Sequence, residues 1–134
     1  MTDDRRGRDL KAVALIAHDS CKDALVEWCL GHREQLSRYK LWATGTTGSV
    51  VAKKSGLTIN KVLSGPLGGD LQIGSKIVSG EIDILIFFWD PLASQPHDPD
   101  IKALLRVAAL KNIPVATNRA TADFLIASPL MDGK

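Results

Sequence analysis

Short runs of apolar residues alternate along this chain with longer segments in which apolar residues recur every three or four positions. The run at 84–88 (Ile-Leu-Ile-Phe-Phe) is continuously apolar rather than alternating. Such a run indicates a strand that is buried on both faces, as in a parallel sheet covered by helices. Similar short runs predict four further strands. The five expected strands are Val13–Ala17, Leu41–Ala43, Val62–Leu63, Ile82–Phe88 and Val115–Ala116.

The segments between these runs have the pattern of helices. In the clearest of them, residues 99–110, the apolar positions follow the i, i+3, i+4, i+7 spacing of a stripe that faces a core. Asp98 is placed to cap this helix, with Pro99 at its first position. Gly56 and Gly80 stand where two other helices need a left-handed last residue. The expected helices are about Cys21–Leu30, Thr47–Ser55, Leu71–Ser79, Pro99–Leu110 and Thr121–Ile126.

Strand and helix alternate about five times, which predicts a single α/β domain of Rossmann-like type. We expect a doubly wound, mostly parallel five-stranded sheet with helices on both faces. The 134 residues are enough for one such domain with a substantial core. We expect this domain to occupy residues 10–134. Residues 1–9 carry six charges and no apolar run, which predicts a flexible arm.

Composition narrows the classes of function. Seventeen basic and fifteen acidic residues give a formal charge of +2 without a basic stripe, which argues against nucleic acid as the main partner. No apolar run approaches the ~20 residues that span a membrane, and no signal-peptide pattern opens the chain. Cys21 and Cys29 lie about 12 Å apart along one expected helix, too far for a disulfide, and their spacing is no metal signature. We therefore expect reduced thiols and a cytoplasmic protein.

Polar or glycine-rich sequence follows each of the first four expected strands. His18, Asp19 and Lys22 follow the first strand, and the loop 44–48 (Thr-Gly-Thr-Thr-Gly) follows the second. The loop 64–70 (Ser-Gly-Pro-Leu-Gly-Gly-Asp) follows the third strand. Because ligands of such sheets bind beyond the carboxyl ends of the strands, these loops are expected to meet at one edge.

The loop after the fourth strand adds a second histidine to this edge. It begins with Asp90 and continues to 96–100 (Pro-His-Asp-Pro-Asp), which contains His97 and Asp100. The two glycine-rich loops have the composition of anion sites, because glycine lets backbone N–H groups approach an anion and hydroxyls add further donors. Asp70 has no cation within four residues in sequence, which favours a role in proton transfer.

Each of these features also has a plainer interpretation. The loop 44–48 fits a helix cap with a tight turn, and Asp70 fits a cap at the start of a helix. Lys22 fits a solvated helix lysine, Asp19 a cap, and the acids of 96–100 the positive end of a helix. The combination nevertheless favours a site for a small phosphorylated substrate. Its chemistry is expected to be proton abstraction, since no activated serine or cysteine nucleophile is evident.

The loops closely resemble those of the methylglyoxal synthase family. The resemblance covers nearly the whole chain in family order. The matching segments are 17–19 with Lys22, 43–48, 63–70, 87–92, 96–100 and 113–118. The resemblance implies conversion of dihydroxyacetone phosphate to methylglyoxal and inorganic phosphate, without a metal or organic cofactor. It also implies a homohexamer that inorganic phosphate inhibits allosterically.

The same resemblance assigns roles to individual residues. It implies that Asp70 is the catalytic base and later proton donor, and that His97 contacts the carbonyl and hydroxyl oxygens of the substrate. It places His18 close to the substrate. The implied supporting acids around the two histidines are Asp19, Asp90 and Asp100. The implied phosphate ligands are Lys22, Thr44, Gly45, Thr46, Thr47, Ser64 and Gly65.

Two other functions remain open from the sequence. A regulatory module of the same fold would bind a phosphorylated effector without chemistry, and it would need neither Asp70 nor His97. A sugar-phosphate isomerase would use the same base on the same substrate. Longer family members bring an arginine to a neighbouring subunit's site from a segment beyond the position of Lys134, and Arg106 or Arg119 are the candidates to replace it here.

Overall fold

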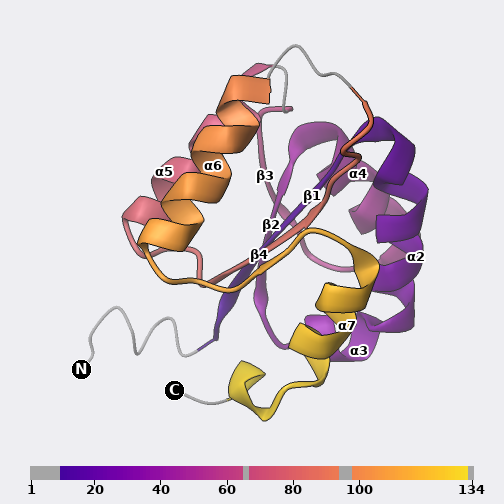
Figure 1. Ribbon diagram of the computed structural model, residues 1–134. Helices are drawn as coiled ribbons and strands as arrows, with labels where there is room; N and C mark the ends of the chain where they lie inside the picture. Colours follow the sequence, from indigo (N-terminus) through magenta and orange to yellow (C-terminus); the bar gives the residue numbers. More distant parts are fainter. Residues whose placement is uncertain (1–9, 65–66, 94–97, 133–134) are drawn as a thin grey trace.

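A five-stranded sheet forms the centre of the protein in the computed structural model (Figure 1). The structure describes residues 10–64, 67–93 and 98–132, and only the backbone of 98–100. Every strand pair is parallel, and the order across the sheet is β3-β2-β1-β4-β5. The strands are β1 (Ala12–Ala17), β2 (Lys40–Thr44), β3 (Asn60–Val62), β4 (Ile84–Phe88) and β5 (Val115–Ala116).

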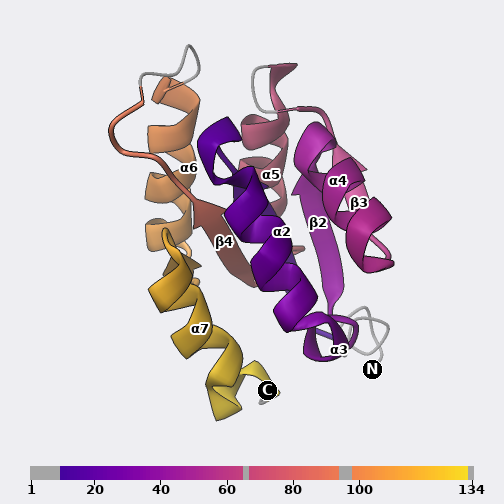
Figure 2. The ribbon, with the colours of Figure 1, turned by 90° about the vertical axis from the view of Figure 1, so that its right-hand side faces the viewer.

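Helices cover both faces of the sheet. On one side lie α2, α3, α4 and α7, which face the viewer in Figure 2, and on the other side lie α5 and α6. Two short 3-10 turns, η1 and η3, lie before α2 and after α7. The bounds are η1 (Asp19–Cys21), α2 (Lys22–Gly31), α3 (Arg33–Leu36), α4 (Gly45–Ser55), α5 (Gly69–Val78), α6 (Asp98–Leu110), α7 (Arg119–Ala127) and η3 (Pro129–Met131).

The order of the strands explains this division. The chain runs from β1 outward to β2 and β3, and then crosses back past β1 to β4 and β5. Connections between parallel strands are right-handed, so reversing the direction of travel moves the connecting helix to the opposite face. The direction changes between β1 and β4, and such a switch point is where α/β sheets bind ligands.

The core consists of two layers separated by the sheet. Leu15 and Phe88 face the layer under α2, α4 and α7, where Trp28 is buried. Ile16 and Phe87 face the opposite layer under α5 and α6. All five residues of β4 are buried, as the continuously apolar run predicts.

The fold expected from the sequence is confirmed, with small shifts in element bounds. The strand Asn60–Val62 begins earlier than the expected Val62–Leu63, and its first residues are polar, which removed the apolar signal. The helix α4 begins at Gly45, so most of the 44–48 loop is in fact its first turn. Cys21 lies in η1 rather than in α2, and both cysteines are free thiols. The short α3 was not predicted.

The helix ends follow the glycine pattern. Gly56 has φ +77° and Gly80 φ +82°, so both adopt the left-handed conformation expected of them. The helix α6 begins at Asp98 itself, which puts Pro99 second rather than first.

The expected flexible arm, residues 1–9, lies outside the described residues. Across the described chain, no helix combines the length and apolar character needed to cross a membrane.

Candidate active site

His18 joins the ends of the two central strands, β1 and β4. Its backbone N–H donates to the carbonyl oxygen of Phe88 at 3.1 Å, and its Nδ1 accepts from the backbone N–H of Asp90 at 3.0 Å. The ring is buried and stands edge-on to Phe87, with 5.4 Å between the ring centroids. Because Nδ1 accepts a hydrogen bond, the geometry assigns the proton of the neutral imidazole to Nε2, which is then a donor.

Asp90 and Lys22 are held by side-chain contacts at this edge. The Asp90 carboxylate accepts from the hydroxyl of Ser20 at 2.7 Å and from the backbone N–H of Leu92 at 3.0 Å. The Ser20 hydroxyl and, next, the Leu92 N–H hold the pKa of Asp90 below its ordinary value of 3.8. Lys22 forms an ion pair with Asp19 at 2.7 Å. Asp19 lies in η1, and it is not the helix cap considered from the sequence.

The loop after β2 packs directly on the loop after β3. The Gly45 N–H donates to the carbonyl oxygen of Leu63 at 3.2 Å. A Cβ at Gly45 would lie 3.2 Å from the Ser64 nitrogen and 3.3 Å from the Val62 oxygen. The two backbones therefore approach each other more closely than a residue with a side chain readily permits. The two glycine-rich loops expected to meet are thus in contact.

The first turn of α4 presents threonines and N–H groups at this contact. Thr44 occupies the N-cap position, yet within the described chain its side chain accepts no capping hydrogen bond. The composition of this loop is therefore not explained by a threonine side chain that caps α4. Thr44 and Thr47 are buried and Thr46 is exposed. Backbone N–H groups in a first helical turn have no intrahelical acceptor, so this turn can bind an anion.

Asp70 lies in the first turn of α5, at the end of the second glycine-rich loop. The carbonyl oxygen of Ser64 accepts from the N–H groups of Leu67 and Gly69, which closes the described part of the loop. Gly68 is the N-cap residue with φ +102°, and a Cβ on Gly69 would overlap the Leu63 carbonyl oxygen. Asp70 is therefore the second residue of the helix and not its cap. Its side chain is 1% exposed.

The helices α5 and α6 lie side by side and start at the same edge of the sheet (Figure 1). Gly74 of α5 faces Leu104 of α6, with 3.8 Å from a Cβ at Gly74 to the Leu104 Cδ1 atom. Asp70 and Asp100 each precede these residues by one helical turn, towards the carboxyl ends of the strands. His97 and Gly65 lie outside the described residues, as does the side chain of Asp100. The roles of these residues and of the other expected site residues stay predictions.

The structure thus brings most of the expected residues to two adjacent groups. One group surrounds His18 and Asp90, and the other joins the Thr44 loop to Ser64 and Asp70. They follow neighbouring strands, because β1 lies between β2 and β4.

Arg119 is paired with Glu27 at 2.7 Å between α7 and α2. Two residues that sequence reasoning missed are Ser20 and Gln72, whose Oε1 accepts from the Leu63 N–H at 2.7 Å.

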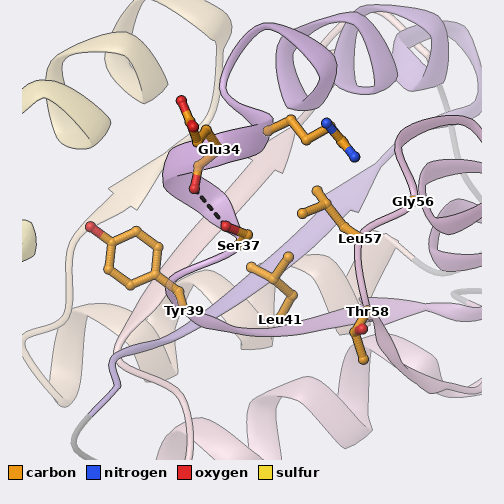
Figure 3. A pocket seen from close by; sticks show the side chains of 8 residues that line it. Glu34, Ser37, Tyr39, Leu41, Gly56, Leu57 and Thr58 are labelled. Carbon is orange, nitrogen blue, oxygen red and sulfur yellow. Dashed lines mark hydrogen bonds between the residues drawn. The ribbon is translucent and has the colours of Figure 1, made fainter.

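A pocket of about 280 Å³ lies at the other edge of the sheet. Figure 3 shows Glu34 and Ser37 on one side of it, with Tyr39 and Leu41 below. Of the expected site residues that the structure describes, none lines this pocket. Among the described residues, no group of three or more His, Cys, Asp or Glu side chains is placed to hold a metal ion.

The fold and this site define an α/β enzyme of the MGS-like class, and the family model of the MGS-like domain matches residues 24–117. Methylglyoxal synthase of Proteus mirabilis (strain HI4320) is 63% identical over 120 residues, which cover 90% of this chain and 79% of that protein. That of Coxiella burnetii (strain RSA 493 / Nine Mile phase I) is 57% identical over 123 residues, covering 92% and 86%.

A solved structure agrees with these relatives. Methylglyoxal synthase from Elizabethkingia anophelis NUHP1 superposes with a TM-score of 0.88 at 49% identity, covering 92% of this chain and 82% of that one. The chain belongs to the methylglyoxal synthase family.

Proposed function

We propose that Asp70 and His97 carry the chemistry of this enzyme, which converts dihydroxyacetone phosphate to methylglyoxal and inorganic phosphate. The observation that carries the proposal is the position of Asp70. Its buried side chain follows a glycine-rich loop whose first residues pack against the Thr44–Thr47 turn. A base in this place can act on the carbon skeleton of a small substrate whose phosphate is bound by the neighbouring loops.

Asp70 is proposed to remove a proton from the hydroxymethyl carbon, next to the carbonyl group. The electron pair of that C–H bond forms an enediolate, and the proton stays on the Asp70 carboxyl group. Such a proton becomes acidic enough only if donors stabilise the developing oxygen charge. Exclusion of water strengthens those donor contacts, and the low exposure of Asp70 supports such an environment.

Two histidines are proposed as these donors. His97 contacts the carbonyl and hydroxyl oxygens, and Asp100 or a backbone group fixes the tautomer of its imidazole. His18 contributes a second neutral imidazole, with its proton on Nε2, as the Asp90 N–H contact supports. A neutral imidazole suits this role because it stabilises the enediolate without giving up a proton to it.

Phosphate then leaves by elimination from the enediolate. The hydroxyl proton passes to the neighbouring enolate oxygen, and the oxygen that loses it forms the aldehyde C=O bond. The C=C pair of the enediolate shifts to form a new C=C bond with the phosphate-bearing carbon, whose C–O bond breaks and takes its electron pair to phosphate. This step requires the C–O bond to stand out of the enediolate plane, so the phosphate ligands must hold that rotamer. Asp70 is the later proton donor as the enol aldehyde becomes methylglyoxal. The proposed ligands are Lys22, Thr44, Gly45, Thr46, Thr47, Ser64 and Gly65, with Asp19 holding Lys22.

We also propose a cytoplasmic homohexamer that phosphate inhibits allosterically. Support for a subunit contact near the site comes from three leucines beside the glycine-rich loop. Leu63, Leu67 and Leu71 are 50%, 71% and 53% exposed in the single chain. Clusters of exposed apolar side chains mark protein contacts. Sedimentation equilibrium tests this part, and a monomer at micromolar concentration would contradict it.

The proposed chemistry is tested by mixing the protein with dihydroxyacetone phosphate and measuring phosphate and methylglyoxal together. Equal amounts of the two products are expected. Glyceraldehyde phosphate instead of methylglyoxal would indicate an isomerase, which holds the phosphate in the enediolate plane. No product with retained ligand binding would indicate the regulatory module.

A further inference from the structure

Ser20 links the loop after β1 to the turn after β4. Its hydroxyl donates to Oδ2 of Asp90 at 2.7 Å, a contact between residues 70 positions apart in the chain. The other oxygen of the same carboxylate, Oδ1, accepts from the backbone N–H of Leu92 at 3.0 Å. The Asp90 side chain is therefore held from both sides, once by its own turn and once by Ser20.

The backbone of Asp90 serves His18. Its N–H donates to the imidazole Nδ1 at 3.0 Å, while the backbone N–H of His18 donates to the Phe88 carbonyl oxygen at 3.1 Å. Ser20 follows His18 by two residues, and Asp90 follows Phe88 by two residues. The hydrogen bonds thus join two short segments in a closed ring, in which a rotation of the Asp90 peptide would break the contact to Nδ1.

We propose that Ser20 is a positioning residue, which holds the Asp90 turn so that its N–H selects the Nε2-protonated tautomer of His18. The inference rests on the proposed function, in which the His18 Nε2–H donates to the substrate. The carboxylate of Asp90 is ionised at neutral pH, because its ordinary pKa of 3.8 already lies far below 7 and the Ser20 and Leu92 contacts lower it further. An ionised carboxylate is a strong acceptor for the Ser20 hydroxyl.

A merely structural link would hold the two segments together without affecting the imidazole. The chain offers a matched control for this alternative. Ser79, at the far end of α5, also donates to a carboxylate, Oε2 of Glu81, at 2.8 Å. Ser79→Ala removes a serine–carboxylate contact of similar length away from His18. Ser20→Thr keeps the hydroxyl, whereas Ser20→Ala removes it.

The tautomer of His18 is measured by ¹⁵N NMR of the two imidazole nitrogens in the unliganded protein at neutral pH. Wild type, Ser20→Thr and Ser79→Ala are expected to show the Nε2-protonated form, and Ser20→Ala a mixture of tautomers. Turnover of dihydroxyacetone phosphate follows the same order. Because Ser20 is exposed, kcat/KM of Ser20→Ala is expected to fall about threefold to tenfold, as for loss of one hydrogen bond.

Two results would overturn the proposal. One is a wild-type tautomer in Ser20→Ala, and the other is an equal loss of kcat/KM in Ser20→Ala and Ser79→Ala. The role of His18 in the proposed reaction is tested separately, by measuring turnover of the His18→Gln variant. Wild-type turnover of that variant would remove His18 from the reaction, whatever the tautomer measurement gives.

Discussion

The backbone N–H of Gly45 donates to the carbonyl oxygen of Leu63 at 3.2 Å, and this contact joins the two glycine-rich loops of the site. The loops lie 18 residues apart in sequence and follow adjacent strands, β2 and β3. Their backbones meet without an intervening side chain. The relative position of the first turn of α4 and of Ser64 therefore depends on the absence of a Cβ at residue 45.

Gly45→Ala is expected to weaken substrate binding while the protein still folds. The new Cβ would lie 3.2 Å from the Ser64 nitrogen, so the loops must move apart by a few tenths of an ångström. We expect KM to rise about tenfold, because phosphate ligands act only in the correct geometry. Steady-state kinetics with dihydroxyacetone phosphate measure this effect.

Gly31→Ala is the matched control for Gly45→Ala. Gly31 ends α2, and a Cβ there meets no heavy atom of the described chain within 4 Å outside its own helix. This variant is expected to keep wild-type kinetics and to gain slightly in stability, because alanine restricts the unfolded chain. Equal KM values for the two variants would contradict the role assigned to the loop contact.

Lys22→Ala is expected to weaken the binding of phosphate, whether as substrate group or as inhibitor. The lysine begins α2 beside His18 and is oriented by Asp19 at 2.7 Å. Loss of its charge should raise KM and the phosphate inhibition constant about tenfold, as for one charge-assisted hydrogen bond. Lys53→Ala, in the exposed last turn of α4, is the control and should change neither constant. Unchanged inhibition in Lys22→Ala would remove it from the phosphate ligands.

Cys29 is expected to resist alkylation in the folded protein. Burial raises the pKa of its thiol from 9.0 to about 12, so little thiolate exists at pH 8. Iodoacetamide labelling followed by mass spectrometry should modify the partly exposed Cys21 first, and Cys29 only after unfolding. Equal labelling of both cysteines in the native protein would contradict the burial of Cys29.

The raised pKa of the Cys29 thiol also predicts how the free energy of unfolding changes at alkaline pH. Above pH 9 the unfolded chain loses the Cys29 proton while the folded chain keeps it, until about pH 12. The unfolded state then binds fewer protons, so the free energy of unfolding falls as pH rises through this range. Urea unfolding at several pH values measures the decline, which should be shallower in Cys29→Ala. An equal slope in both proteins would assign the effect to other groups.

The sheet could be predicted because its signal is local. The apolar run of β4 and the regular alternation of strands and helices are sufficient to predict a parallel sheet with two covered faces. That topology alone also predicts that the loops after the strands lie together at the carboxyl edge of the sheet. The short α3 and the polar start of β3 lacked such a pattern, since tertiary contacts rather than periodicity determine them.

The internal contacts of the site could not be predicted in the same way. Ser20 and Asp90 meet only because β1 and β4 are neighbours, and no spacing in the sequence indicates which hydroxyl reaches which carboxylate. The place of Asp70 in its helix depends on the left-handed Gly68, which is the N-cap residue of α5, two residues before the acid. The sequence left a capping aspartate open, and the backbone conformation excludes it.

Asp70→Asn gives the most direct test of the central claim, that Asp70 is the base. Asp23→Asn, an exposed aspartate in the first turn of α2, is the matched control, and circular dichroism checks that both variants fold. Release of phosphate and methylglyoxal from dihydroxyacetone phosphate is measured for both variants and the wild type. Loss of the base predicts that kcat of Asp70→Asn falls at least about a hundredfold, with Asp23→Asn unchanged. Near-normal turnover by a folded Asp70→Asn protein would contradict the account.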